Sequence, residues 1–271
     1  MQKASLDAVW LAWLREWMYR GGDMSQAVLE LRRQGFSDAA IVTALEAVRP
    51  KGNALDHGAM RSLPLIRRAP SNLCRMEAAG FPLYTLTDFL SPTECAELIG
   101  MIGGHLQPSP LSRAHEDPEF RTSTTANLYE IDDPRARAID EKICRTLGIR
   151  AEFSEGIQAQ RYEAGQQFKP HWDCFEAGTN TYQRFAGVRG NRTWTFMVYL
   201  NDGMEGGATR FTEIGQAVQP KAGMALFWDN LHEDGSPNQA TRHCGEPVTR
   251  GHKVIITKWF RVHGDGPVLH D

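Results

Sequence analysis

The chain has 271 residues, and its 41% hydrophobic and 23% charged content is typical of a globular protein, which excludes wholesale disorder. A net charge of −3 and a sequence pI near 6.3 argue against a nucleic-acid partner or an anionic membrane surface. Five cysteines without CxxC spacing argue against a disulfide framework and favour a reducing cytoplasm. The longest apolar run near the start, residues 8–14, is flanked by Asp7 and by Arg15 and Glu16, and no small-residue cleavage site follows it, so neither a signal peptide nor a membrane span is expected.

Residues 1–50 are predicted to form a small helical module of three short helices. The first helix carries a mainly aromatic stripe at helical spacing, made of Trp10, Trp13, Leu14, Trp17 and Met18. Gly21 and Gly22 end this helix, Ser37 caps the third, and Pro50 follows it. The stripe either packs the module and docks it on the main domain, or forms a contact surface for a partner or a second copy.

The sequence pattern changes at about residue 51 and again at about residue 76. Residues 51–75 carry proline, glycine and arginine without periodicity and are predicted to be a linker or an irregular wrap. The main domain is therefore expected to span 76–271. It begins with a strand at 82–90, followed by helices at about 92–103 and 136–148.

After residue 150 the chain becomes a series of short strands separated by glycine, proline and asparagine turns. The predicted strands are GIQAQRYE, FKPHWDCF, TWTFMVYLND, GATRFTE, AVQP, GMALFWDN and HKVIITKWFRV. Many short strands at this spacing predict a sandwich or a barrel, with the preceding helices packed outside it.

Two potential metal ligands lie on one of these strands. His171 and Asp173 are two residues apart in FKPHWDCF, so both side chains should point to one face while Trp172 points to the other. A second imidazole from a later strand would complete a two-His-one-carboxylate site, which binds Fe(II) and leaves positions open for substrate and oxygen. His243, in TRHCGEPVTRGHKVIITKWF, is the predicted third ligand.

A lysine on the last predicted strand is a candidate binding residue for a carboxylate. Strand alternation places Lys253 on one face of HKVIITKWF and Lys258 on the opposite face. If His243 faces the interior of the barrel, Lys253 can face it too, and Lys258 is predicted to be solvated. A buried lysine needs a partner, and the distal carboxylate of 2-oxoglutarate is a suitable one.

Four segments resemble successive motifs of the prolyl 4-hydroxylase-like branch of the Fe(II)/2-oxoglutarate-dependent dioxygenases: RYEAGQQFKPHWD, TFMVYLNDGMEGGATRF, VQPKAGMALFW and HCGEPVTRGHKVIITKWF. The resemblance covers about residues 150–262 well and 76–150 loosely. It implies a double-stranded β-helix, or jelly roll. The predicted fold class is therefore mainly β with flanking helices, plus the N-terminal helical module.

The resemblance also implies roles for individual residues. The iron ligands would be His171, Asp173 and His243. The 2-oxoglutarate contacts would be Lys253, as salt-bridge partner of the C5 carboxylate, Tyr162, Thr195 near that same carboxylate, and Trp259. Substrate contacts would come from Arg121, Ser123 and Glu155. The implied reaction hydroxylates an unactivated C–H bond of a prolyl residue or a related peptide, protein or amino-acid side chain. It consumes molecular oxygen, releases succinate and CO2, and is expected to depend on L-ascorbate.

Two departures from the family pattern leave the substrate open. Phe168 stands where the family often has tyrosine, and Arg261 stands where it often has histidine. Two stretches, 109–120 and 176–191, are candidates for a lid. Arginines in and just after the second stretch (Arg184, Arg189 and Arg192) are either solvated or contact an acidic or peptide substrate.

Two alternative functions stay open from the sequence. A nucleic-acid base demethylase would require a basic groove with aromatic stacking, which the net charge of −3 does not favour. An oxygen-sensing or metal-binding interaction protein without turnover would need neither Lys253 nor Tyr162. No nucleic-acid or membrane partner is expected.

Overall fold

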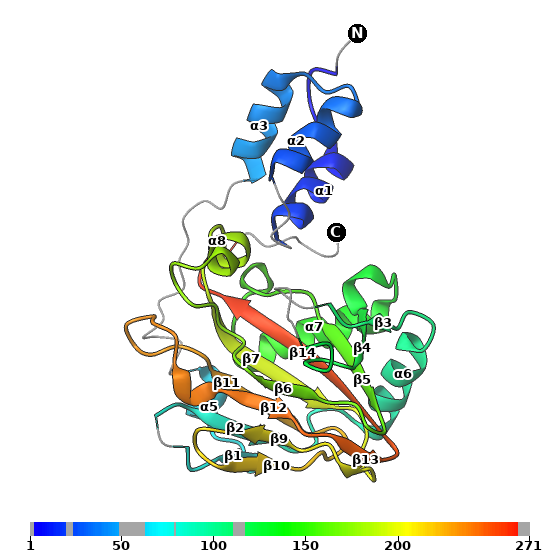
Figure 1. The fold of residues 1–271 in the computed structure, drawn as a ribbon, viewed down its shortest axis with the longest axis vertical. Coiled ribbons are helices and arrows are strands. Elements are labelled where there is room, and N and C mark those ends of the chain that lie inside the picture. The colour runs from blue at the N-terminus through cyan, green and yellow to red at the C-terminus, as the bar shows by residue number, and fades with distance from the viewer. Residues whose placement is uncertain (1–2, 20–23, 49–62, 79, 111–116, 265–271) are drawn as a thin grey trace.

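The computed structural model describes residues 3–19, 24–48, 63–78, 80–110 and 117–264, and its strands form two main antiparallel sheets (Figure 1). In spatial order, the larger sheet contains β1 (Leu73–Arg75), β2 (Leu83–Leu86), β11 (Ala225–Asp229), β7 (Arg192–Tyr199), β14 (His252–Arg261), β5 (Gln158–Glu163), β4 (Thr124–Asn127) and β3 (Gln107–Pro108). The smaller sheet contains β10 (Gln216–Val218), β9 (Thr209–Phe211), β12 (His243–Gly245) and β6 (Phe168–His171). A separate pair joins β13 (Val248–Arg250) to β8 (Glu205–Gly206).

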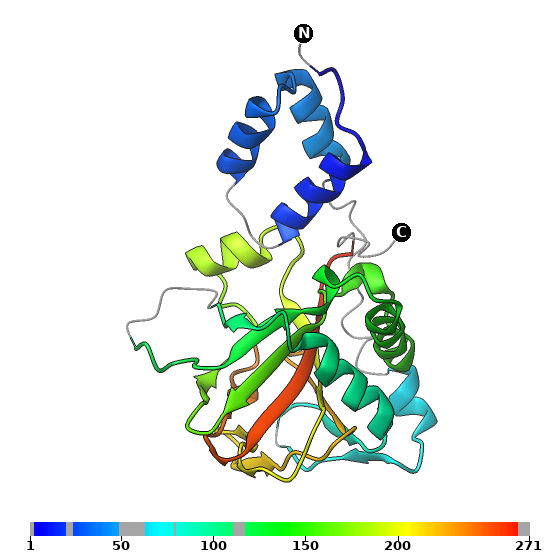
Figure 2. The ribbon, with the colours of Figure 1, turned by 90° about the vertical axis from the view of Figure 1, so that its right-hand side faces the viewer.

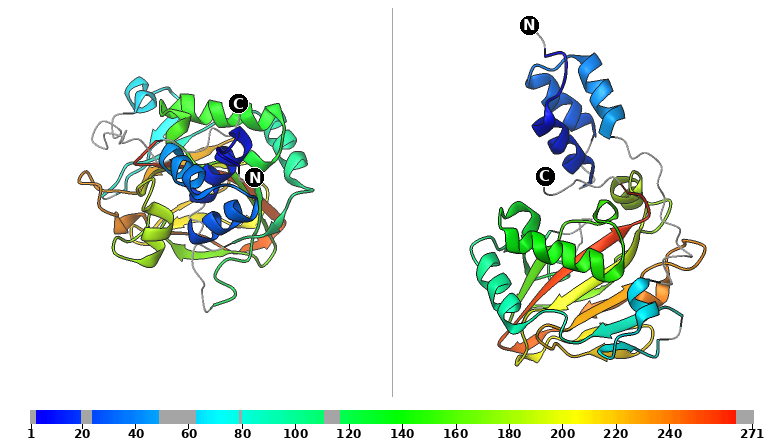
Figure 3. Two further views of the ribbon diagram at one scale, coloured as in Figure 1. Left: turned by 90° about the horizontal axis from the view of Figure 1, so that it is seen from above. Right: turned by 180° about the vertical axis from the view of Figure 1, so that it is seen from behind.

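The two sheets share an apolar core, because alternate residues of their strands point toward each other. Tyr162 of β5 and Ile255 of β14 belong to one buried cluster with Phe211 of β9 and Val218 of β10. The opposite face of the larger sheet is covered by α6 (Pro92–Ile102) and α7 (Pro134–Leu147), as Figures 2 and 3 show from two sides. The predicted fold, a mainly β jelly roll with helices packed outside it, is confirmed.

Local sequence rules explain where the two covering helices begin and end. Ser91 caps α6 in a reciprocal capping box: its hydroxyl accepts from the Glu94 amide at 3.2 Å, and the Glu94 carboxylate accepts from the Ser91 amide at 2.7 Å. Gly148 ends α7 with a left-handed φ of 74°. A side chain at Gly148 would also collide with Pro64, so this glycine both stops the helix and lets a preceding segment pack closely.

The segment before β2 corrects the predicted linker. Residues 63–75, expected to lie in the linker, contain the short helix α5 (Pro64–Arg68) and strand β1, which pairs with β2. Leu63 and Leu65 are buried in the main core. Burial of the apolar residues of LPLI (63–66) fixes this segment on the main domain, although its sequence shows no periodicity. This part of the chain therefore belongs to the main domain. The rest of the predicted linker, 51–62, lies outside the described residues.

The N-terminal helices form a bundle with its own apolar core. They are α1 (Ala8–Tyr19), α2 (Met24–Arg33) and α3 (Asp38–Val48). Trp10, Trp13 and Trp17 lie partly buried against this core, so the aromatic stripe contributes to packing the bundle. Figures 1 and 2 place the bundle beyond α8 (Asn180–Ala186), at one end of the molecule. A partner or oligomer contact through this surface stays a prediction.

The remaining elements are short. Within the described ranges, 3₁₀ turns lie at Leu128–Glu130, Ala151–Phe153 and Gln239–Thr241. None of the helices in the described part of the chain combines the length and apolar character needed to cross a membrane.

Lys258 contradicts the prediction of a solvated side chain. It lies on the outer face of β14, as strand alternation requires, but α7 covers that face. Its side chain is 0% exposed, and its Nζ donates to the Asp140 carboxylate at 2.6 Å and to the Glu155 carbonyl at 2.8 Å. The predicted parity is therefore right, and the error was to equate the outer face with solvent.

Replacing Asp140 with alanine should lower the free energy of unfolding by about 3 kcal/mol, because it leaves a buried ammonium without its carboxylate. The matched control is Asp132→Ala, which removes a 96% exposed carboxylate that pairs with Arg137. Urea unfolding followed by circular dichroism should show a large loss of stability for the first variant and almost none for the second. Equal, small losses would contradict a structural role for the Lys258 pair.

Candidate metal centre and cosubstrate cavity

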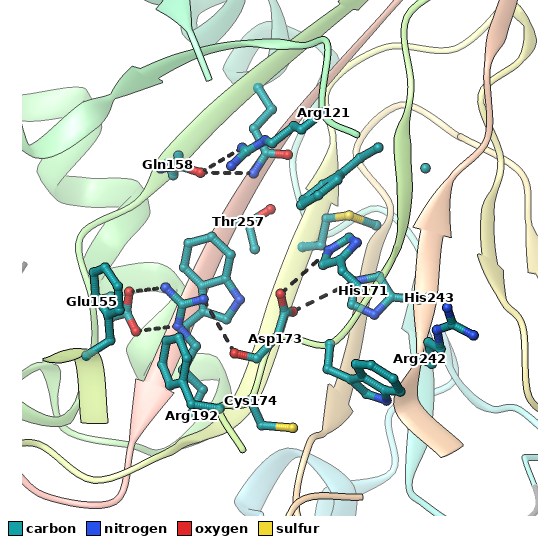
Figure 4. Close-up of a pocket in the computed structure, with 18 of the residues that line it drawn as sticks. Arg121, Glu155, Gln158, His171, Asp173, Cys174, Arg192, Arg242, His243 and Thr257 are labelled. Atoms are coloured by element: carbon teal, nitrogen blue, oxygen red, sulfur yellow. Dashed lines mark hydrogen bonds and ion pairs between the residues drawn. The ribbon is translucent and has the colours of Figure 1, made fainter. Parts of the chain in front are cut away.

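Three potential metal ligands converge between the sheets (Figure 4). His171 at the end of β6 is paired directly across from His243 at the start of β12. Asp173 follows β6 in a bend, so the strand predicted to continue through it ends at His171. The ligating atoms lie within 4.8 Å of one another, and each histidine Nε2 is 3.9 Å from an Asp173 carboxylate oxygen. This set of two imidazoles and a carboxylate suits Fe(II).

Backbone carbonyls select the tautomer of both histidines. The Nδ1 atom of His171 lies 2.9 Å from the Lys169 carbonyl, and Nδ1 of His243 lies 2.9 Å from the Thr241 carbonyl. Because a carbonyl can only accept, each Nδ1 carries the proton and each Nε2 lone pair is left for a metal. Burial and the neighbouring His243 lower the pKa of His171 to about 3, so this ring is neutral at physiological pH, as a ligand must be.

A buried chain of side-chain hydrogen bonds holds the Asp173 carboxylate. The Thr195 hydroxyl donates to Asp173 Oδ2 at 2.7 Å and accepts from the Asn230 amide at 2.8 Å. The Trp228 indole donates to Asn230 Oδ1 at 2.8 Å. Sequence reasoning missed Asn230 and Trp228, because nothing in GMALFWDN marks them as partners of a ligand in a different segment.

The location of Thr195 corrects its predicted place near the 2-oxoglutarate C5 carboxylate. Thr195 is opposite Trp259 in the sheet register, whereas the proposed carboxylate partner Lys253 lies six residues away along β14. At the rise of a β-strand this separates their backbones by about 20 Å. The threonine hydroxyl is already engaged with Asp173. Thr195 therefore positions a metal ligand.

Lys253 lies on the inward face of β14, as predicted, and is 1% exposed. Its Nζ donates to the Gly207 carbonyl at 2.8 Å and lies 4.5 Å from the centre of the Tyr162 ring. It forms no ion pair with any carboxylate in the described part of the chain. Burial lowers the pKa of Lys253 to about 8. A Cβ at Gly245 would lie 3.3 Å from Nζ, so this glycine leaves room around the ammonium.

The metal ligands and Lys253 line one cavity of about 930 Å³. Alternate residues of β14, which include Ile255, Thr257 and Trp259, form part of its wall. Tyr162 of β5 lines it too, and its hydroxyl donates to Gln160 Oε1 at 2.9 Å. Gln160 was missed, although its position two residues before Tyr162 on the same strand places both on one face.

Charged residues gather at the Trp259 end of the cavity. The Glu155 carboxylate accepts from Arg192 at 2.6 and 2.7 Å, and Arg261 lies 3.3 Å from it. Burial opposes ionisation of Glu155, but the two arginines outweigh it and hold the pKa of Glu155 below its usual value. The Arg192 guanidinium also lies 4.0 Å from the centre of the Trp259 ring. Arg261 further donates to the Phe185 carbonyl of α8.

The two other predicted substrate residues lie at a different edge. Arg121 lines the cavity, donates to Gln158 at 3.1 Å, and lies 4.8 Å from the centre of the Phe168 ring. Ser123 is 2% exposed and does not line the cavity. Its hydroxyl lies 3.4 Å from Arg121 Nε, so Ser123 supports Arg121 and does not face the substrate space.

The candidate lid stretches are described in part. In the second stretch, α8 contributes Thr181, Arg184 and Phe185 to the cavity wall. The interpretation as solvated loop arginines is wrong for Arg189, which is buried against the carbonyls of Ser154 and Glu152. It is also wrong for Arg192, as the Glu155 pair shows. Residues 111–116 of the first stretch lie outside the described residues.

Comparison with known proteins agrees with this geometry. Residues 157–261 match the family described as the 2OG-Fe(II) oxygenase superfamily. Prolyl 4-hydroxylase subunit alpha-1 of Mus musculus is 35% identical over 156 residues, which cover 58% of this chain and 29% of that protein. Prolyl 4-hydroxylase subunit alpha-3 of Homo sapiens is 32% identical over 181 residues, covering 65% and 33%. The chain thus spans about a third or less of these relatives.

Solved structures of similar proteins extend the match beyond the sequence motifs. A viral collagen prolyl hydroxylase from Paramecium Bursaria Chlorella virus-1, in its 2OG complex, has a TM-score of 0.55 and 25% identity, covering 69% of this chain and 99% of that one. A prolyl hydroxylase from Trichoplax adhaerens, in complex with a hypoxia inducible factor peptide fragment, shares the fold, with a TM-score of 0.50 and 15% identity over 76% and 90% of the chains. Residues 157–261 are therefore similar to the 2OG-Fe(II) oxygenase superfamily, and the chain is similar in sequence and fold to prolyl hydroxylases.

Proposed function

We propose that this chain is an Fe(II)- and 2-oxoglutarate-dependent dioxygenase that hydroxylates a prolyl residue or a related peptide or amino-acid side chain. One C–H bond of the substrate becomes C–OH, while 2-oxoglutarate is converted to succinate and CO2. The two atoms of O2 enter the alcohol and the succinate. The observation that carries this proposal is Lys253, a buried ammonium in the same cavity as the metal ligands and without a carboxylate partner among the described residues.

Each group in the cavity has a distinct task in this proposal. His171, Asp173 and His243 would hold Fe(II), which supplies oxygen activation when bound. Lys253 would bind the distal carboxylate of 2-oxoglutarate in a site that excludes water. Glu155 and Arg192, at the other end of the cavity, would orient the substrate relative to the metal.

The two alternative functions have less support. An interaction protein without turnover would gain nothing from a buried lysine in the metal cavity, because the lysine costs free energy unless an anion binds it. A base demethylase is not favoured by the net charge of −3, and the relatives described above are prolyl hydroxylases. We propose in addition that L-ascorbate supports turnover. We also propose a cytoplasmic location, which the five free thiols support.

The direct test measures succinate formed from 2-oxoglutarate in air with Fe(II), using proline-containing peptides and free amino acids as candidate substrates. His171→Ala should abolish succinate formation, because it removes a metal ligand. Lys253→Ala should chiefly raise the KM for 2-oxoglutarate, by about tenfold or more, because it removes a charged hydrogen bond. Absence of succinate from the unmodified protein with every candidate, despite bound metal, would overturn the enzymatic proposal.

The affinity for 2-oxoglutarate should depend on pH through Lys253. Below its pKa of about 8 the lysine is protonated and can bind a carboxylate; above that pH it is neutral and the attraction is lost. The KM for 2-oxoglutarate should therefore be flat below pH 8 and rise about tenfold per pH unit above it. Lys253→Arg should remove the rise, because arginine stays charged. The same rise in Lys253→Arg would assign it to a different group.

The hydrogen-bond chain behind Asp173 makes a separate prediction about metal affinity. Thr195→Val keeps the side-chain volume but removes the hydroxyl that donates to the carboxylate. It should weaken Mn(II) binding by about ten- to a hundredfold. Electron paramagnetic resonance of free Mn(II) measures this directly. Thr193→Val is a suitable control, because Thr193 is buried on the same strand but donates to the Phe260 carbonyl. Equal losses in both variants would contradict a positioning role for Thr195.

A further inference from the structure

Two side chains at the mouth of the cavity are not used by the reaction proposed above. Trp172 lies between the ligands His171 and Asp173 in the sequence, and Arg242 immediately precedes His243. Both line the cavity, so the prediction that Trp172 points away from the ligands is wrong: β6 ends at His171, and strand alternation no longer applies beyond it. Each is the direct sequence neighbour of a predicted metal-binding residue. A molecule that contacts Trp172 and Arg242 is therefore held at a fixed place relative to the metal site.

Trp172 presents a flat apolar surface in a fixed orientation. It is 39% exposed, which is unusual for a large hydrophobic side chain in this molecule. Its indole nitrogen donates to the Gln239 carbonyl at 3.0 Å, so the ring is anchored at one edge. An exposed and pre-oriented aromatic ring can stack on a ligand with little loss of side-chain entropy.

Arg242 stands beside this ring with few partners of its own. Its guanidinium lies 5.1 Å from the centre of the Trp172 ring. Its other contact within the described residues is an ion pair with Glu213 at 3.5 Å, in which both side chains are more than a third exposed. A guanidinium carries five N–H donors, and Nε of Arg242 is buried without a hydrogen-bond acceptor in the described part of the chain. The exposed edge of the guanidinium, on a side chain that is 39% exposed, offers further N–H donors to an incoming carbonyl oxygen.

The cavity wall thus carries polar groups on both sides of the metal ligands. Figure 4 shows Glu155 and Arg192 on one side, then Asp173 and the two histidines, and Arg242 on the far side. Contacts connect this row: Arg192 pairs with Glu155 and lies 3.5 Å from the Asp173 carbonyl, and Asp173 lies 3.9 Å from His243. An extended peptide bound at Glu155 can run past the ligands to Arg242, and its backbone supplies the carbonyl oxygens that a guanidinium binds.

We propose that Trp172 and Arg242 form a second substrate subsite, which binds the residue that flanks the hydroxylated one in an extended peptide. Trp172 stacks on a ring-bearing side chain, proline or aromatic, and Arg242 donates to a backbone carbonyl of the same segment. This inference rests on the proposed function, and it makes the substrate a peptide segment with a ring next to the reacting residue, as distinct from a free amino acid.

The test measures peptide binding without turnover. Fluorescein-labelled peptides with a central proline and proline, phenylalanine, leucine or alanine at either flanking position are titrated anaerobically with the full chain, Mn(II) and 2-oxoglutarate. Fluorescence polarisation should show peptides with a flanking ring binding about three- to tenfold more tightly than those with leucine or alanine. Separate proline and phenylalanine peptides distinguish the two kinds of ring.

Variants assign the preference to the two residues. Trp172→Ala should abolish the preference for a ring, whereas Trp172→Phe should keep part of it. Arg242→Ala should weaken the binding of all the peptides by roughly tenfold. The matched control is Arg250→Ala, which removes an equal charge from a 77% exposed arginine paired with Glu205. Mn(II) affinity of each variant, measured by paramagnetic resonance, separates loss of the subsite from loss of the metal.

Two outcomes would overturn the subsite: equal affinity for ring and leucine peptides, or a ring preference that Trp172→Ala leaves intact. Succinate formation with free amino acids, but no binding of any peptide, would remove the subsite and keep the proposed function. Ring-dependent peptide binding without succinate formation would keep the subsite and remove the proposed function.

Discussion

The direct pairing of His171 with His243 across β6 and β12 is the constraint on which the rest of the site depends. A slip of one residue in this register would turn one imidazole to the opposite face. The core holds the register in place: β12 also pairs with β9, and Phe211 of β9 packs against Trp228. Trp228 in turn contacts the His243 ring at a centroid distance of 4.8 Å. The packing of the apolar core therefore fixes the positions of the two histidines.

The same tryptophan connects the core to the third ligand. Its indole N–H begins the chain of hydrogen bonds through Asn230 and Thr195 to the Asp173 carboxylate. All three ligands are thus oriented from behind: the histidines by backbone carbonyls and the aspartate by a buried side-chain relay. Because a metal ligand set must be held with little freedom to bind tightly, such support is as necessary as the ligands themselves.

The features of the fold and of the site that depend on residues close together in the sequence could be predicted from the sequence. The capping box at Ser91 and Glu94, the left-handed stop at Gly148 and the inward face of β14 each follow from neighbouring residues alone. Lys258 and Thr195 were misplaced because their environments are set by segments far away in the chain. Asp140 on α7 pairs with Lys258, and Asp173 accepts from Thr195. Strand parity says which face a residue takes, and only the packed fold says what covers that face.

The two buried lysines of β14 show how the fold separates structure from function. Lys258 has a carboxylate partner at 2.6 Å, whereas the contacts of the Lys253 ammonium among the described residues are a carbonyl and an aromatic ring. A buried ammonium without a counter-ion is costly, so it persists where an anion is to be bound. Arg261 lies eight residues beyond Lys253 on the same strand, about 26 Å along it. The Lys253 end and the Arg261 end of the cavity are therefore built from different residues, so the departure from the family pattern at Arg261 does not touch the surroundings of Lys253.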